Sequence, residues 1–229
     1  MKKSGQRGMG WYLIVVLGLM SYFFRSNQLS GGSILLCVAF SILCVLGFAL
    51  CAAALAPGSA YSALFVRDPA EAVFSIPGAL LLGAGAVMIL MRGSTVNRIV
   101  GALGVLAAAG LVIAAVGRLS SQPPRVFPFV LAVLFYIVRL FFSFRGWMLD
   151  PAILDYCFQL LAMISFMLAS YFAGEYCFDK GRRRLLCFFA LTGVFFGASA
   201  LAGAETAELL IYGGSTLWML ALCRRVLTA

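Results

Sequence analysis

The sequence predicts an all-α membrane protein, a single polytopic bundle of transmembrane helices formed by residues 1–229. Three observations lead to this class. Of the 229 residues, 63% are hydrophobic and only 11% are charged, whereas a soluble domain has about 45–50% and 25%. The apolar residues form runs of about 18 or more, the length that a helix needs to cross a bilayer core of about 30 Å. No segment shows the ten-residue alternation of a membrane β-barrel, so helices are expected throughout.

Eight spans follow one another along the chain. They are predicted at residues 9–24, 32–55, 72–91, 96–117, 127–143, 152–174, 185–203 and 206–223. Glycine, proline or charged residues separate them, at residues 25–32, 57–69, 93–97, 119–125, 145–151, 178–184 and 203–205. The first span follows three basic residues and has no small-residue cleavage site, so it is expected to remain as an anchor. Seven spans are the alternative, if the short first or last segment does not cross.

The positions of Lys and Arg predict the orientation, because short loops rich in these residues stay in the cytoplasm. With eight spans and a cytoplasmic N-terminus, 12 of the 17 basic residues lie inside, and Arg25, Arg92, Arg98 and Arg145 lie outside. Arg139 falls within a span. Both termini are therefore expected in the cytoplasm of a cell-membrane protein. The net charge of +9 then reflects topology and attraction to anionic lipid headgroups, which makes nucleic-acid binding an unnecessary interpretation.

Small residues indicate how the helices pack. Gly193 and Gly197 form a GxxxG pair in the seventh predicted span. Such a pair lets two helices approach closely, either within the chain or across a homodimer. Cys37, Cys44 and Cys51 recur every seven residues on one face of the second span, where packing is the expected role. With no histidine and no CxxC motif, no metal or cofactor is expected.

Missing residue types argue against a conventional enzyme. The chain has no histidine, which excludes His-dependent acyl or phosphoryl transfer and the HExxH metalloproteases. It also has no Walker motif and no GxSxG motif. We therefore assign no catalytic residue and expect no enzymatic activity.

Ionisable residues at membrane depth are the best pointers to a binding site, because burying a charge there costs at least about 2.5–3.5 kcal/mol. Arg139 and Asp155 each lie about one turn inside the outer end of their spans, which a short loop connects. Two antiparallel neighbours would place these charges at similar depth, where they could pair. Tyr156 and Gln159 extend the polar set, since Gln159 lies one turn after Asp155. These four residues are the predicted substrate site, unless Arg139 only reaches toward the interface and Asp155 compensates its charge.

Interrupted helices are a second possible source of a binding site, because an unwound segment exposes backbone groups. Residues 75–78 at the start of the third span and residues 213–216 in the last span combine glycine with serine, threonine or proline. The alternative is that both segments belong to ordinary membrane helices, in which Pro and Gly are common and Ser or Thr can satisfy the freed carbonyl groups.

The C-terminal half, from Tyr136 and Arg139 through Trp147 and Asp155 to the basic loop at 180–184, resembles small polytopic bacterial membrane proteins that have no characterised function. The resemblance implies the same membrane class and no activity. The expected function is the binding or transport of a small solute. The alternative is a non-catalytic membrane subunit or scaffold that docks a partner through the basic loop.

Overall fold

The computed structural model describes residues 10–64, 69–120, 125–148 and 156–228, and every regular element in these ranges is a helix. This confirms the predicted all-α class. The elements are α2 (Gly10–Leu29), α3 (Ile34–Ala54), α4 (Tyr61–Leu64), α5 (Pro69–Met91), α6 (Thr95–Leu119), α7 (Phe127–Trp147), α8 (Cys157–Glu175), the 3-10 helix η2 (Tyr176–Phe178), α9 (Arg183–Leu201) and α10 (Thr206–Thr228).

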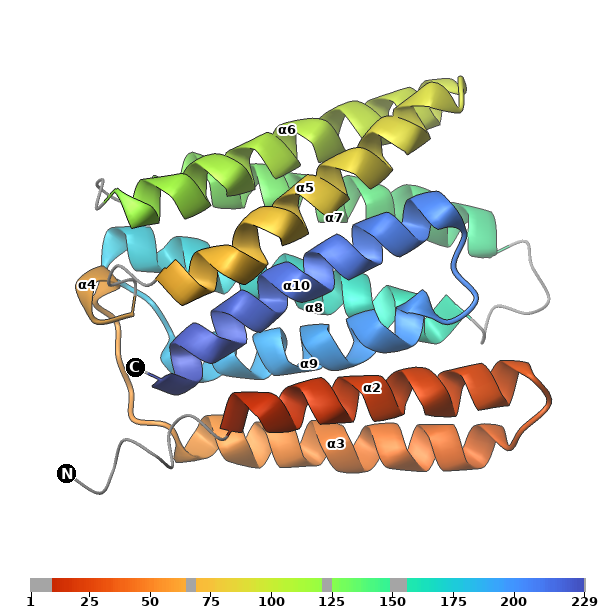
Figure 1. Ribbon diagram of the computed structural model, residues 1–229, viewed down its shortest axis with the longest axis horizontal. Coiled ribbons are helices and arrows are strands. Elements are labelled where there is room, and N and C mark those ends of the chain that lie inside the picture. Colours follow the sequence, from red (N-terminus) through yellow and green to blue (C-terminus); the bar gives the residue numbers. More distant parts are fainter. Residues whose placement is uncertain (1–9, 65–68, 121–124, 149–155, 229) are drawn as a thin grey trace.

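Seven helices of the described chain are long and apolar enough to cross a membrane, namely α3, α5, α6, α7, α8 with η2, α9 and α10. The helix α2 has 20 residues, about 30 Å at 1.5 Å per residue, but Arg25, Asn27 and Gln28 make its last turns polar. It lies antiparallel to α3, and its start is at the same end of the bundle as the end of α10 (Figure 1). The long helices therefore traverse the bundle eight times.

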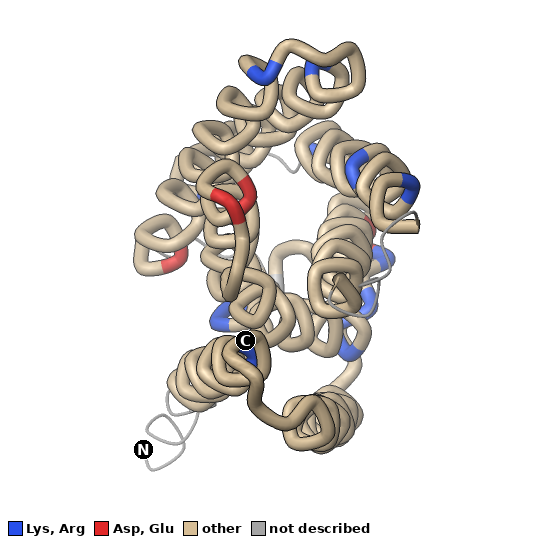
Figure 2. Tube along the Cα trace, turned by 90° about the vertical axis from the view of Figure 1, so that its right-hand side faces the viewer, with Lys and Arg blue, Asp and Glu red and all other residues tan. Residues whose placement is uncertain are grey.

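Six helices form a closed ring in chain order. Each of α5 to α9 packs against the next helix, and α10 closes the ring by packing against α5. Figure 2 views the bundle from one end. The α2–α3 hairpin lies outside this ring and packs on α9, as the red and orange helices of Figure 1 show. Because α9 is the ring helix that the hairpin covers, 72% of its span is buried, against 22% for α3.

The outer surface of α3 is strongly apolar. Leu35, Leu43 and Leu50 are all more than 70% exposed, at 75%, 71% and 73%. An apolar surface of this kind is unfavourable in water and suits contact with lipid chains. The exposed leucines therefore agree with a helix at the periphery of a membrane bundle.

Two glycines let α5 and α10 cross in direct backbone contact. A Cβ atom added to Gly214 would lie 2.5 Å from the carbonyl oxygen of Gly78, and one added to Gly78 would lie 2.7 Å from the carbonyl oxygen of Gly214. No side chain fits at either position. This crossing is the small-residue packing expected of membrane helices.

Both glycines belong to the segments considered as helix breaks, and the helix-break interpretation is wrong. The helix α5 continues through Pro77, and α10 continues through residues 213–216. Ser215 and Thr216 donate hydrogen bonds to the carbonyl groups of Ile211 and Tyr212, four residues earlier. These bonds satisfy the two hydroxyl groups within the helix, so the glycines serve helix packing instead of exposing backbone groups.

The GxxxG pair of α9 also packs within the chain. A Cβ atom on Gly193 would lie 3.2 Å from Met219 of α10 and 3.3 Å from Phe166 of α8, and one on Gly197 would meet Thr216 and Phe166. The two glycines are thus covered by neighbouring helices of the same ring. This supports intramolecular packing over a homodimer face at this position.

Candidate functional site

One row of side chains on α10 points into the ring. Glu208, Tyr212, Ser215 and Trp218 recur at spacings of three or four residues, which places them on one face of a helix. The hydroxyl group of Tyr136 on α7 donates a hydrogen bond of 2.7 Å to Oγ of Ser215. Because α7 lies opposite α10 in the ring order, this bond crosses the ring interior. The row therefore lines the inside of the ring.

The first ionic cluster lies at the start of this row. It is formed by Arg139 of α7 with Glu208 and Tyr212 of α10, and we call it the Arg139 cluster. Nη2 of Arg139 lies 3.6 Å from Oε1 of Glu208, and the Arg139 side chain is only 4% exposed. The guanidinium carbon lies 5.1 Å from the centre of the Tyr212 ring. Nε and Nη1 of Arg139 are buried and have no hydrogen bond to a described residue. The guanidinium group thus retains donors that an anionic or polar ligand could use.

The predicted substrate residues are only partly brought together. Asp155 lies outside the described residues, so its pairing with Arg139 stays a prediction, and the acidic partner that the structure gives to Arg139 is Glu208. The ring of Tyr156 stacks on Trp147, with centroids 4.9 Å apart and an interplanar angle of 8°. Oε1 of Gln159 is buried and has no hydrogen bond to a described residue. The described contacts of Arg139 are therefore with Glu208 and Tyr212 of α10.

The second charged group is the Glu71 cluster, formed by Glu71 of α5, Arg118 of α6 and Arg225 of α10, with Trp218 beside it. Oε1 of Glu71 lies 3.0 Å from Nη1 of Arg118, and Oε2 lies 3.4 Å from Nε of Arg225. The three side chains are at most 10% exposed. The guanidinium carbon of Arg118 lies 5.1 Å from the centre of the Trp218 ring. One carboxylate thus joins three helices of the ring.

Helix geometry explains why these charges meet. Glu71 is in the first turn of α5, whereas Arg118 and Arg225 are in the last turns of α6 and α10. An acidic residue at a helix N-terminus and a basic residue at a C-terminus are each favoured by the helix dipole. Since α5 is antiparallel to both neighbours, these three termini lie at one end of the ring (Figure 1). The dipoles and the ion pairs therefore stabilise the same arrangement.

Tyr61 on the short helix α4 lies within the electrostatic reach of this cluster. Burial raises the pKa of the Tyr61 phenol, and the nearby positive charge of Arg118 opposes that shift. A phenol with a pKa above its usual value of 10 stays neutral at pH 7. Tyr61 therefore adds a neutral polar group near the Glu71 cluster.

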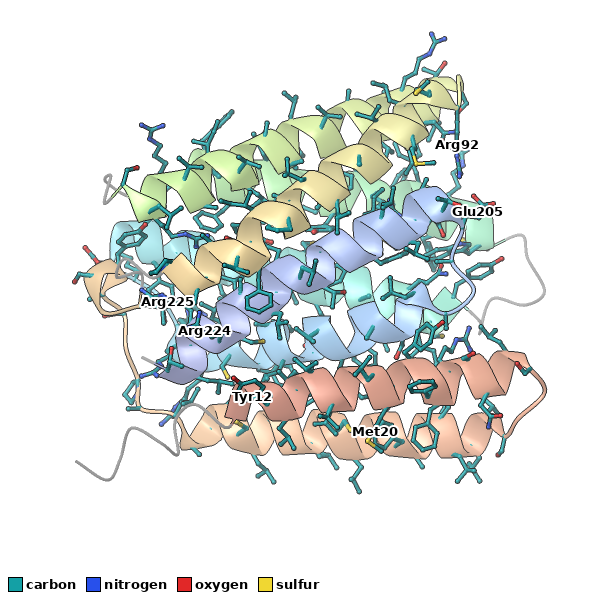
Figure 3. All side chains as sticks on the ribbon, viewed as in Figure 1. Tyr12, Met20, Arg92, Glu205, Arg224 and Arg225 are labelled. Carbon is teal, nitrogen blue, oxygen red and sulfur yellow. The ribbon has the colours of Figure 1, made fainter. Side chains whose placement is uncertain are left out.

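The opposite end of the ring carries a more exposed ion pair. Nη2 of Arg92 lies 2.6 Å from Oε2 of Glu205, with side chains 44% and 69% exposed. Figure 3 shows this pair at one end of the bundle and Arg224 and Arg225 at the other. An exposed pair contributes at most about 1 kcal/mol, so the buried clusters are the stronger candidates for function. Within the described ranges, no group of three or more His, Cys, Asp and Glu side chains could hold a metal ion.

Sequence reasoning missed the Glu71 cluster because the predicted spans were too short. The predicted span at 72–91 begins just after Glu71, and those at 96–117 and 206–223 end just before Arg118 and Arg225. The helices of the structure include all three residues. An average of hydropathy falls at any charge, whether or not that charge is paired. The available signal was the position of Glu71, an acidic residue two positions after Pro69 at the start of an apolar run.

The fold and the composition define a class, the multi-pass α-helical membrane proteins. No protein-family model, no curated protein and no solved structure matches the chain.

Proposed function

We propose that the protein binds a small solute inside the ring of α5 to α10 and carries it across the cell membrane. One observation carries this proposal. Two ionic clusters, each built on a buried arginine, lie at opposite ends of the same ring, and the polar row on α10 connects them. A carrier must close each end of its pathway in turn, and ion pairs between helices can break and re-form as helices move. The Arg139 and Glu71 clusters would be the two closures.

Arg139 is the proposed ligand for the solute. Its guanidinium group is buried and has two nitrogen atoms without a hydrogen bond to a described residue. Arginine binds carboxylate and phosphate groups through paired hydrogen bonds, which are strong when water is excluded. The solute would therefore carry an anionic group. Asp155, Tyr156 and Gln159 remain predicted contributors to the site.

The orientation belongs to the same proposal. The end of the bundle with the Glu71 cluster also carries Arg125, Lys180 and Arg182–Arg184, and the excess of basic residues there favours the cytoplasm. Solute would then enter from outside near Arg139 and leave past Glu71. No enzymatic step is part of the proposal.

The test is a thermal-stability screen of the purified protein in mild detergent against small carboxylates, amino acids and phosphate esters. A ligand should raise the midpoint of unfolding of the unmodified protein and of the control variant Arg98→Gln, whose side chain is exposed. It should leave the midpoint of Arg139→Gln unchanged. Uptake of that ligand into proteoliposomes is the second step. A ligand that stabilises Arg139→Gln equally well would contradict the proposed site.

The second candidate function is a membrane subunit that docks a partner through the loop at 180–184. The observation in its favour is the exposure of this loop, in which Arg182 is 62% exposed. A protein that purifies with the chain in stoichiometric amount, and is lost when Lys180 and Arg182 are changed, would favour this function. A chain that purifies alone and transports solute would exclude it.

A further inference from the structure

A hollow of about 450 Å³ lies at the end of the bundle that carries the Glu71 cluster. It is lined by residues 57–59 between α3 and α4 and by residues 181–185 at the start of α9. Its volume is within the range of small-molecule sites, roughly 300–1,000 Å³. We call it the arginine hollow, because Arg182, Arg183 and Arg184 all line it.

Hydrogen bonds between the two loops fix the walls of the arginine hollow. The backbone N–H of Gly181 donates to the carbonyl oxygen of Ser59 over 3.2 Å. The hydroxyl group of Tyr176 donates to the carbonyl oxygen of Gly58 over 3.1 Å. Next to them, the carboxylate of Asp179 accepts a bond of 2.8 Å from the N–H of Tyr61. The hollow is therefore formed before any ligand binds.

Two of the three arginines are held in place by helix ends. Nε and Nη2 of Arg183 donate to the carbonyl oxygen of Val226 over 3.3 and 2.7 Å, and Nε of Arg184 donates to that of Leu55 over 3.0 Å. Arg182 is 62% exposed and has Glu175 3.4 Å from its Nε. Three positive charges thus line the hollow, and neither of the nearby carboxylates, those of Glu175 and Asp179, is part of its lining. Fixed guanidinium groups lose little freedom when they bind an anion, which favours a phosphate ligand.

The surroundings indicate where that phosphate comes from. Leu185 lines the hollow and is 36% exposed, and Phe178 just before the basic loop is 64% exposed. Both lie at the end of apolar membrane helices, where lipid headgroups meet hydrocarbon chains. Basic pockets at the cytoplasmic ends of membrane helices suit anionic lipid headgroups. A free phosphate ion would leave these apolar side chains without a matching surface.

We propose that the arginine hollow binds the phosphate group of an anionic phospholipid. The three arginines neutralise the phosphate, and the lipid chains remain in the membrane beside Leu185. The bound lipid links the end of α3 to the start of α9, and so holds the α2–α3 hairpin on the ring. This inference is independent of solute transport.

The test is native mass spectrometry of the detergent-purified full chain, titrated with phosphatidylglycerol or with phosphatidylcholine. Phosphatidylglycerol should bind at least fivefold more tightly than phosphatidylcholine. Its affinity should fall about fivefold for each arginine removed in Arg182→Gln and Arg184→Gln, from about 1 kcal/mol per basic residue near the surface. Arg98→Gln, at the other end of the bundle, is the matched control and should bind as the unmodified protein does. The exposed Arg182 can be changed alone, so the test does not depend on a variant that fails to fold.

Three outcomes would overturn the inference. Equal binding of the two lipids, or an unchanged affinity in the double variant Arg182→Gln/Arg184→Gln, would show that the hollow does not select an anionic headgroup. Displacement of phosphatidylglycerol by an equal concentration of inorganic phosphate would indicate a site for soluble phosphates. Loss of a stoichiometric protein partner in the double variant, with lipid binding unchanged, would indicate a protein-docking site.

Discussion

The substitution Glu71→Gln removes the carboxylate that both Arg118 and Arg225 contact, and changes the shape of the side chain very little. The two guanidinium groups stay buried, at 8% and 10% exposed, so water cannot replace the lost charge. Removing one partner of a buried ion pair costs about 3–5 kcal/mol. We use the lower value, about 3 kcal/mol, because both arginines have further interactions. The matched control is Glu205→Gln, whose partner Arg92 is exposed and whose loss should cost less than about 1 kcal/mol.

Thermal unfolding in detergent measures this difference. For a chain of this size, 1 kcal/mol corresponds to about 2–4 °C. The midpoint should therefore fall by about 6–12 °C in Glu71→Gln and by less than about 4 °C in Glu205→Gln. A thiol-reactive fluorescent dye reports unfolding, because Cys187 and Cys223 are buried in the folded chain.

A double-mutant cycle completes the test. The variant Glu71→Gln/Arg118→Gln should lose less unfolding free energy than the two single variants lose together, by at least about 1 kcal/mol. The reason is that the second change removes a charge that the first left uncompensated. Equal midpoints for Glu71→Gln and Glu205→Gln, or strictly additive single changes, would refute the reasoning.

Three further predictions concern packing and topology. Gly214→Ala places a Cβ atom 2.5 Å from the carbonyl oxygen of Gly78 and should cost about 1–3 kcal/mol in the same unfolding assay. The control is Gly47→Ala, which has no atom within 4 Å of the new Cβ and should be neutral or stabilising. Equal losses of stability in Gly214→Ala and Gly47→Ala would contradict the close crossing of α5 and α10. Tyr136→Phe removes the buried hydrogen bond to Ser215 and should lower stability by about 1–2 kcal/mol, whereas an unchanged midpoint would mean that the bond contributes nothing. Reporter tags at the two termini should both face the cytoplasm, and tags on opposite sides would refute eight crossings.

The sequence by itself determined the class of the protein and the order of its helices. Each membrane helix needs about 20 consecutive, mostly apolar residues to cross the bilayer. This requirement concerns residues adjacent in the chain, so it can be read from the sequence. The predicted span at 127–143 therefore falls inside α7 (Phe127–Trp147), and all eight predicted spans correspond to helices. The position of Arg139 within an apolar run also marked it as a residue that needs a partner.

Only the tertiary structure decided which residues meet. Glu208 reaches Arg139 from a helix 69 positions later in the chain, because α7 and α10 face each other across a ring that no local pattern describes. Glu71, Arg118 and Arg225 looked like loop charges, because hydropathy counts a charge as polar even when an opposite charge compensates it. The two glycines at the crossing of α5 and α10 were possible helix breaks, because local sequence does not show what packs against a glycine. A glycine weakens an isolated helix, yet in the bundle it permits backbone contact with a second glycine that only the fold brings close.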